Sequence, residues 1–110
     1  MLGNQDVYVN AVGGFKLVEP AADLAVCLAV ASSFRDRALD RTLVSIGEVG
    51  LTGEIRMVPR ALQRVREAAN LGFAKILVPW GNLAEIRKDP VHIELIGVKT
   101  LSQAMEVGLK

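Results

Sequence analysis

Residues 20–33, PAADLAVCLAVASS, carry the strongest fold signal in the chain. Pro20 suits the first turn of a helix, where its missing N–H would be unpaired anyway, and Asp23 places negative charge near the positive end of the helix dipole. A helix is therefore predicted from about Ala21 to Ser33. Every position from Leu24 to Ala31 is apolar, so this helix has no polar face. It is either a central helix that is covered on nearly all sides or a helix with one face against a partner subunit.

A pair of short strands is predicted in front of this helix. Residues 6–12 alternate in the pattern of a strand, Gly13-Gly14 follows, and residues 15–18 are mostly apolar. This pattern indicates a β-hairpin or a tightly turned strand pair. A strand that starts so close to Met1 leaves open that the chain is a fragment lacking its N-terminal part.

Strands and helices alternate after the first helix. The predicted strands cover residues 43–46, 54–58, 74–78 and 91–96. The predicted helices cover residues 59–71, 83–87 and 100–108. Gly72 ends the second of the long helices, and Thr100 with Gln103 forms a capping box for the last one. The alternation predicts a single α/β (α+β) domain over residues 1–110, with helices packed on a mixed sheet.

Composition limits the function classes. Of the 110 residues, 51% are hydrophobic and 23% charged, which is enough to bury a core without metals or disulfides. Thirteen basic and twelve acidic side chains give a net charge of +1, so any binding to nucleic acid requires a local basic patch. The single cysteine, Cys27, lies in an apolar run and is interpreted as a buried, inert thiol. A cytoplasmic protein without a membrane-spanning segment is expected.

The glycine cluster at residues 47–53, GEVGLTG, is not a nucleotide-binding motif. It lacks the lysine of a phosphate-binding loop, and no helix follows its last glycine directly, as a dinucleotide fingerprint requires. We interpret it as a turn that needs a permissive backbone. The chain alone is therefore not expected to hydrolyse ATP.

His92 and Trp80 are two further candidates for a functional role. His92 is the only histidine, so a metal site would lack a second imidazole, and no metal is expected in this chain. Trp80 lies between Pro79 and Gly81 at a strand end, where it could stack on a base or ligand. Packing over the sheet edge is the preferred interpretation of Trp80.

Long strings of residues in a fixed order add a family resemblance. They cover residues 2–10, 12–26, 31–37 and 47–56. Together with Arg64, Glu67, Ala68, Ala69 and Leu71-Gly-Phe, they resemble the C-terminal domain of the RadA (Sms) family of bacterial DNA-repair ATPases. The resemblance spans nearly the whole chain.

More distantly, the chain resembles the Lon proteolytic domain, which implies a two-layer fold and a serine–lysine pair. The family's nucleophile lies in Gly-Pro-Ser-Ala-Gly, and residues 19–23 read EPAAD, with Ala21 in the place of the serine. The family's base lies in Gly-Gly-Leu-Lys, and residues 59–62 read PRAL, with Leu62 in the place of the lysine. Neither a methyl nor an isobutyl group can act as nucleophile or base. The resemblance therefore implies a pseudo-protease, and the chain is not expected to be an enzyme.

The resemblance also implies partners. The parent protein would carry a zinc-binding element and a RecA-like ATPase core, with ATP, Mg and Zn bound outside this chain. It would assemble into a hexameric ring and act in DNA repair and recombination after DNA damage. This domain would scaffold the ring and bind or guide single-stranded or branched DNA. The alternatives are a Lon-like interaction module unrelated to DNA and an active Ser-Lys peptidase.

Two groups of arginines are candidates for DNA contacts. Arg56 ends a predicted strand, and Arg60 and Arg64 lie four apart on the following helix, so the two can point the same way. Glu67, one turn beyond, is the only side chain expected to offset their positive charge. We predict that Arg56, Arg60 and Arg64 form one positive stripe that faces the channel of the ring. The second group, after the first helix, comprises Arg35, Arg37 and Arg41. Ordinary solvated charges are the competing interpretation of both groups.

Overall fold

The computed structural model describes residues 20–109. The strand pair predicted at residues 6–18 lies outside these described residues. The elements, in chain order, are η1 (Pro20–Ala22), α2 (Asp23–Arg35), β1 (Leu43–Ser45), β2 (Glu48–Val49), β3 (Ile55–Arg56), α3 (Ala61–Asn70), β4 (Lys75–Pro79), η2 (Trp80–Asn82), α4 (Leu83–Ile86), β5 (Glu94–Val98) and α5 (Leu101–Gly108).

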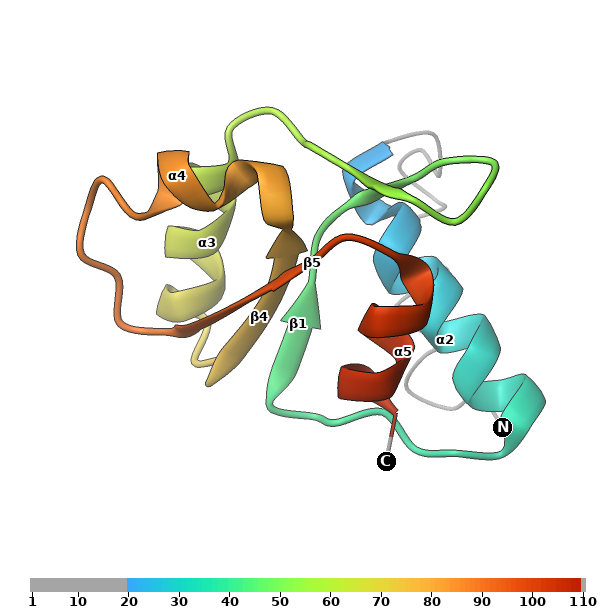
Figure 1. Cartoon of the computed structure of the whole chain (residues 1–110). Helices are drawn as coiled ribbons and strands as arrows, with labels where there is room; N and C mark the ends of the chain where they lie inside the picture. Colours follow the sequence, from blue (N-terminus) through green and yellow to red (C-terminus); the bar gives the residue numbers. More distant parts are fainter. Residues whose placement is uncertain (1–19, 110) are drawn as a thin grey trace.

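Three parallel strands form the central sheet, in the order β1-β4-β5 (Figure 1). Leu43 of β1 pairs with Lys75 of β4, which pairs with Glu94 of β5. The strands β2 and β3 form a separate antiparallel pair. The predicted α/β class is confirmed. In the described part of the chain the central sheet is parallel rather than mixed, because the antiparallel pair lies outside it.

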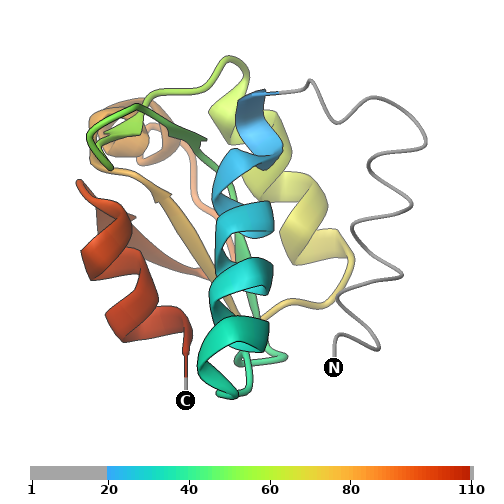
Figure 2. The same cartoon turned by 90° about the vertical axis from the view of Figure 1, so that its right-hand side faces the viewer.

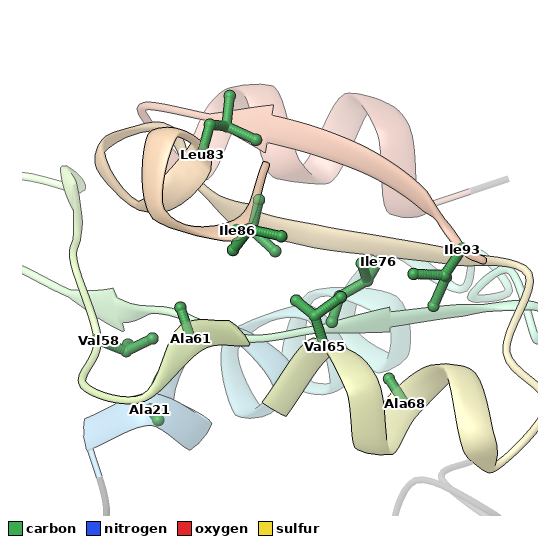
Figure 3. Close-up of a cluster of buried hydrophobic side chains, with 10 residues drawn as sticks. Ala21, Val58, Ala61, Val65, Ala68, Ile76, Leu83, Ile86 and Ile93 are labelled. Carbon is green, nitrogen blue, oxygen red and sulfur yellow. The ribbon is translucent and has the colours of Figure 1, made fainter. Parts of the chain in front are cut away.

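Helices cover both faces of this sheet. Alternate side chains of β4 point to opposite faces, so Ile76 and Val78 pack in one cluster with α3 and α4 (Figure 3). Leu77 packs in a second cluster with α2 and α5. The continuous apolar run of β4 is typical of a strand that is buried on both faces.

The predicted first helix is confirmed as α2, but the described residues do not cover all its sides. Leu24 and Leu28, one turn apart, are buried against the sheet. Val30 and Phe34 are 58% and 92% exposed, and Figure 2 shows α2 as an outer helix. The expectation of a central helix is therefore wrong within residues 20–109. The alternative, a face that meets a partner subunit, stays a prediction.

Candidate nucleic-acid interface

Arg60 and Arg64 lie together at the start of α3. Arg60 immediately precedes the helix with a positive φ of 56°, and its carbonyl accepts a hydrogen bond of 3.1 Å from the Arg64 N–H. Arg64 Nε donates to the Pro59 carbonyl oxygen at 2.9 Å. Arg60 is exposed and Arg64 half-buried. The structure thus brings two of the three predicted stripe residues onto one helical turn.

A buried asparagine fixes the turn that leads into α3. Asn82 is 1% exposed, and its Oδ1 accepts a hydrogen bond of 2.9 Å from the Val58 N–H. Its Nδ2 donates to the Val58 carbonyl oxygen at 3.1 Å. The left-handed backbone of Arg60 is unusual for a residue with a Cβ, and it follows directly on this clamped segment. Asn82 therefore holds the segment that leads into the first turn of α3.

The third stripe residue, Arg56, is already paired with carboxylates. Its Nη2 and Nε lie 2.9 and 3.2 Å from Glu54 Oε2, and its Nη1 lies 3.7 Å from Glu48 Oε2. Glu48 cannot be recognised as a partner from the sequence, because it lies opposite Arg56 only through the β2–β3 register. Glu48 and Glu54 therefore offset the positive charge of Arg56.

Glu54 stays ionised well below neutral pH. The Thr52 hydroxyl, then a backbone N–H and the Arg56 guanidinium, lower the pKa of Glu54 to about 2. The hairpin that carries these residues turns at Gly53, which has a φ of 85°. The prediction that the glycine cluster needs a permissive backbone is confirmed at this position.

The second arginine group lies at the opposite end of the sheet. Arg35, Arg37 and Arg41 lie at the end of α2 and on the segment that precedes β1. The turn into α3 lies instead at the end of the sheet where β1 terminates. The two ends of the green β1 arrow in Figure 1 mark these two locations. The Arg37 N–H donates to the Ser32 carbonyl, and Arg37 Nη2 lies 3.5 Å from the Leu109 carbonyl oxygen. Within one copy of the chain, the two arginine groups therefore do not form a single site.

A groove of about 910 Å³ lies between α2 and β1, beside the second arginine group. Its walls include Leu28, Val44 and Phe73. Asp40 lies on its rim and forms an ion pair of 3.1 Å with Lys75. The hydroxyl and N–H of Thr42, together with Lys75, lower the pKa of Asp40 to about 2.

The two positions of the implied serine–lysine pair fall in one apolar cluster. Ala21 is buried, and Leu62 packs against the same cluster from α3. Figure 3 shows Ala21 close to Val58 and to Ala61, which is the first residue of α3. Only hydrocarbon side chains stand at these two positions, so they offer no nucleophile or base.

His92 and Cys27 are the remaining single candidates for a functional role. Among residues 20–109, no three potential metal-ligating side chains come together. His92 is exposed and precedes β5 rather than lying within it. Burial, and then the charge of Asp23, raise the pKa of the Cys27 thiol, which favours its unreactive protonated form. No described helix is long and apolar enough to span a membrane.

Known proteins match nearly the whole chain. The family model described as subunit ChlI of Mg-chelatase matches residues 4–82. DNA repair protein RadA of Listeria monocytogenes is 51% identical over 109 residues, which are 99% of this chain and 24% of that protein. RadA of Bacillus subtilis is 50% identical with the same coverage, and RadA of Escherichia coli is 50% identical over 96% of this chain and 23% of its own length.

The chain spans about a quarter of the length of these relatives. The similarity thus concerns one domain of a longer protein and agrees with the resemblance to RadA seen in the residue strings. The chain therefore belongs to the family that the ChlI model describes, and it is similar to one part of the longer RadA proteins.

Proposed function

We propose that this chain is the non-proteolytic, Lon-like domain of a RadA-type DNA-repair and recombination ATPase, and that it binds DNA and supports ring assembly. The observation that carries the proposal is the 51% identity to a DNA repair protein over 99% of the chain. ATP, Mg and Zn would be bound by the other parts of the parent protein. The replacement of the implied dyad by Ala21 and Leu62 supports a role without proteolysis.

The start of α3 supports DNA binding. Arg60 and Arg64 share one turn, and Asn82 holds the segment before it in a fixed conformation. Guanidinium groups in such a place suit contacts with phosphate oxygens, which give sequence-independent and salt-dependent affinity. Arg56 contributes less in this proposal than in the sequence prediction, because Glu54 and Glu48 already offset its charge.

The outer side of α2 supports assembly. Val30 and Phe34 lie one turn apart and leave large apolar side chains exposed among the described residues. Exposed apolar surface of this kind commonly marks contacts between proteins. We assign it to a neighbouring copy of this domain in a closed, hexameric ring.

The decisive experiment is a double charge reversal, Arg60→Glu with Arg64→Glu, in the full-length protein. Binding of single-stranded and branched DNA is followed by fluorescence anisotropy over a series of salt concentrations. The double variant should bind every sequence more weakly, and its salt slope should fall by roughly one for each phosphate contact removed. Thermal stability and assembly should stay unchanged.

Two further variants make the result specific. Arg66→Glu is the matched control, because Arg66 lies on the same helix but already pairs with Asp89. Arg35→Glu with Arg41→Glu tests the second group. If this pair weakens binding and the α3 pair does not, the DNA path lies at the other end of the sheet. If wild-type protein binds no DNA even at low salt but still assembles, the domain is an interaction module unrelated to DNA.

A further inference from the structure

Trp80 is an exposed aromatic side chain at the carboxyl end of the central sheet. It directly follows β4, and 55% of its surface is accessible to solvent. Ligands of open parallel sheets commonly bind outside the carboxyl ends of the strands. The only tryptophan of the chain thus lies at an edge where binding sites occur, with much of its apolar surface unused by the core.

The indole is held in place although it is not covered. A Cβ built on Gly97 would lie 3.1 Å from Trp80 Cε3, so the ring lies close against the backbone of β5. Pro79, just before it, pairs with Val98 in the sheet. Lys99 Nζ lies 5.1 Å from the ring centroid, within the range of a cation–π contact. A ring oriented in this way loses little conformational freedom when it binds a ligand.

The backbone of Lys99 is equally well fixed. Its N–H donates to Gln103 Oε1 at 2.7 Å, and its carbonyl accepts a hydrogen bond of 2.8 Å from the Ile55 N–H. The ion pairs formed between residues 20–109 use Arg56, Arg66 and Lys75 as their cations, and Lys99 takes part in none of them. Its ammonium group remains able to pair with an anion.

We propose that Trp80 and Lys99 form a site for one unpaired nucleotide of single-stranded DNA, with the base stacked on the indole and a neighbouring phosphate paired with the ammonium group. A base whose faces are exposed can stack on an aromatic side chain, whereas a base within a duplex is already stacked on its neighbours. Met57 is a further exposed apolar side chain, and it lies close to the backbone of Gly81, the residue after Trp80. The inference rests on the proposed DNA binding and names the form of DNA and one contact.

A contact with another protein would use the same apolar surface but would give no role to the cation. Lys99 lies beside the ring and forms no ion pair with residues 20–109, which favours an anionic polymer with flat bases. Arg60, three residues after Met57, adds a second exposed cation on the segment that leads into α3.

The test uses the 110-residue chain, in which tryptophan fluorescence reports on Trp80 alone. Oligo-deoxythymidine should quench this fluorescence, and the quenching should saturate as the oligonucleotide concentration rises. A duplex of equal length should leave most of the fluorescence unquenched. Trp80→Ala should weaken binding of the single strand roughly 5- to 100-fold, and Trp80→Phe should lose less. Lys99→Gln should lower the salt slope by about one.

Controls separate the possible outcomes. Leu71→Ala removes a similarly exposed apolar side chain from the turn after α3 and should change neither affinity nor fluorescence. Circular dichroism checks that each variant is folded. DNA binding without quenching, and unchanged by Trp80→Ala, overturns the stacking site but leaves the proposed function intact. No binding by wild type defeats both. Loss of self-association in Trp80→Ala, with unchanged affinity for the single strand, makes Trp80 an interface between copies and overturns the site.

Discussion

The side-chain amide of Asn82 forms two hydrogen bonds with the backbone of Val58, one in each direction. Asn82 ends the short η2 that begins with Trp80, and Val58 lies just before the turn into α3. The two segments that carry the candidate DNA contacts are therefore joined directly. Few other side chains could replace this pairing, because it requires a donor and an acceptor on one planar group.

Asn82→Ala is expected to lower the free energy of unfolding by roughly 2–4 kcal/mol, because the buried N–H and carbonyl of Val58 both lose their partner. Urea unfolding followed by circular dichroism measures the change. Asn70→Ala, at the exposed end of α3, is the matched control. A loss in Asn82→Ala no larger than in this control would contradict the role of Asn82.

Acid should weaken the domain partly through Glu54. The pKa of Glu54 is lowered from its ordinary value of 4.5 to about 2 in the folded state. The stability that its ionised form contributes is therefore fully present above pH 4.5 and is lost as the pH falls towards about 2. Thermal unfolding of Glu54→Gln, from about pH 6 to about pH 2, should show a smaller dependence on pH than wild type.

Two comparisons sharpen this acid experiment. Asp40 also has a lowered pKa and contributes in the same window, but it is present in both proteins and cancels in their difference. Glu67→Gln removes a carboxylate from the exposed side of α3 and should keep the wild-type profile. Identical profiles for Glu54→Gln and wild type would show that the hairpin does not depend on the ionised Glu54.

Phe34→Ser in the full-length protein should weaken ring assembly, because Phe34 is the most exposed large hydrophobic side chain of α2. Multi-angle light scattering with ATP and DNA present measures the mass of the assembly. Leu71→Ser is the control, because it replaces an exposed apolar side chain on the turn after α3 with the same polar one. An unchanged mass distribution for Phe34→Ser over a dilution series would place the interface elsewhere.

The sequence predicted those elements whose signals are local. A continuous apolar run after Pro20 indicates α2, the apolar spacing between Pro59 and Gly72 indicates α3, and the apolar run before Pro79 indicates β4. The capping box of α5 is confirmed in the Thr100 hydroxyl, which accepts a hydrogen bond of 3.1 Å from the Gln103 N–H. The Gln103 side chain, however, reaches back to the Lys99 N–H instead of that of Thr100.

The sequence could not predict what depends on register and on distant pairs. The last strand was expected at residues 91–96, but pairing with β4 sets β5 at Glu94–Val98. The neutralisation of Arg56 by Glu48 follows from the β2–β3 pairing, and the Asn82–Val58 clamp joins residues with no local sequence signal. For the same reason the sequence predicts a positive stripe of three arginines without showing that Glu48 and Glu54 offset the charge of Arg56.

The order of the strands has a consequence for folding kinetics. No two neighbours in the central sheet are joined by a hairpin, since β2, β3 and α3 separate β1 from β4, and η2 and α4 separate β4 from β5. Before β1 can pair with β4, or β4 with β5, the chain between the two strands must close a long loop. The entropy lost in this closure is compensated only later, when the side chains pack. A newly synthesised chain exposes both apolar faces of β4 until the helices dock, and this interval is when the domain is most prone to aggregation.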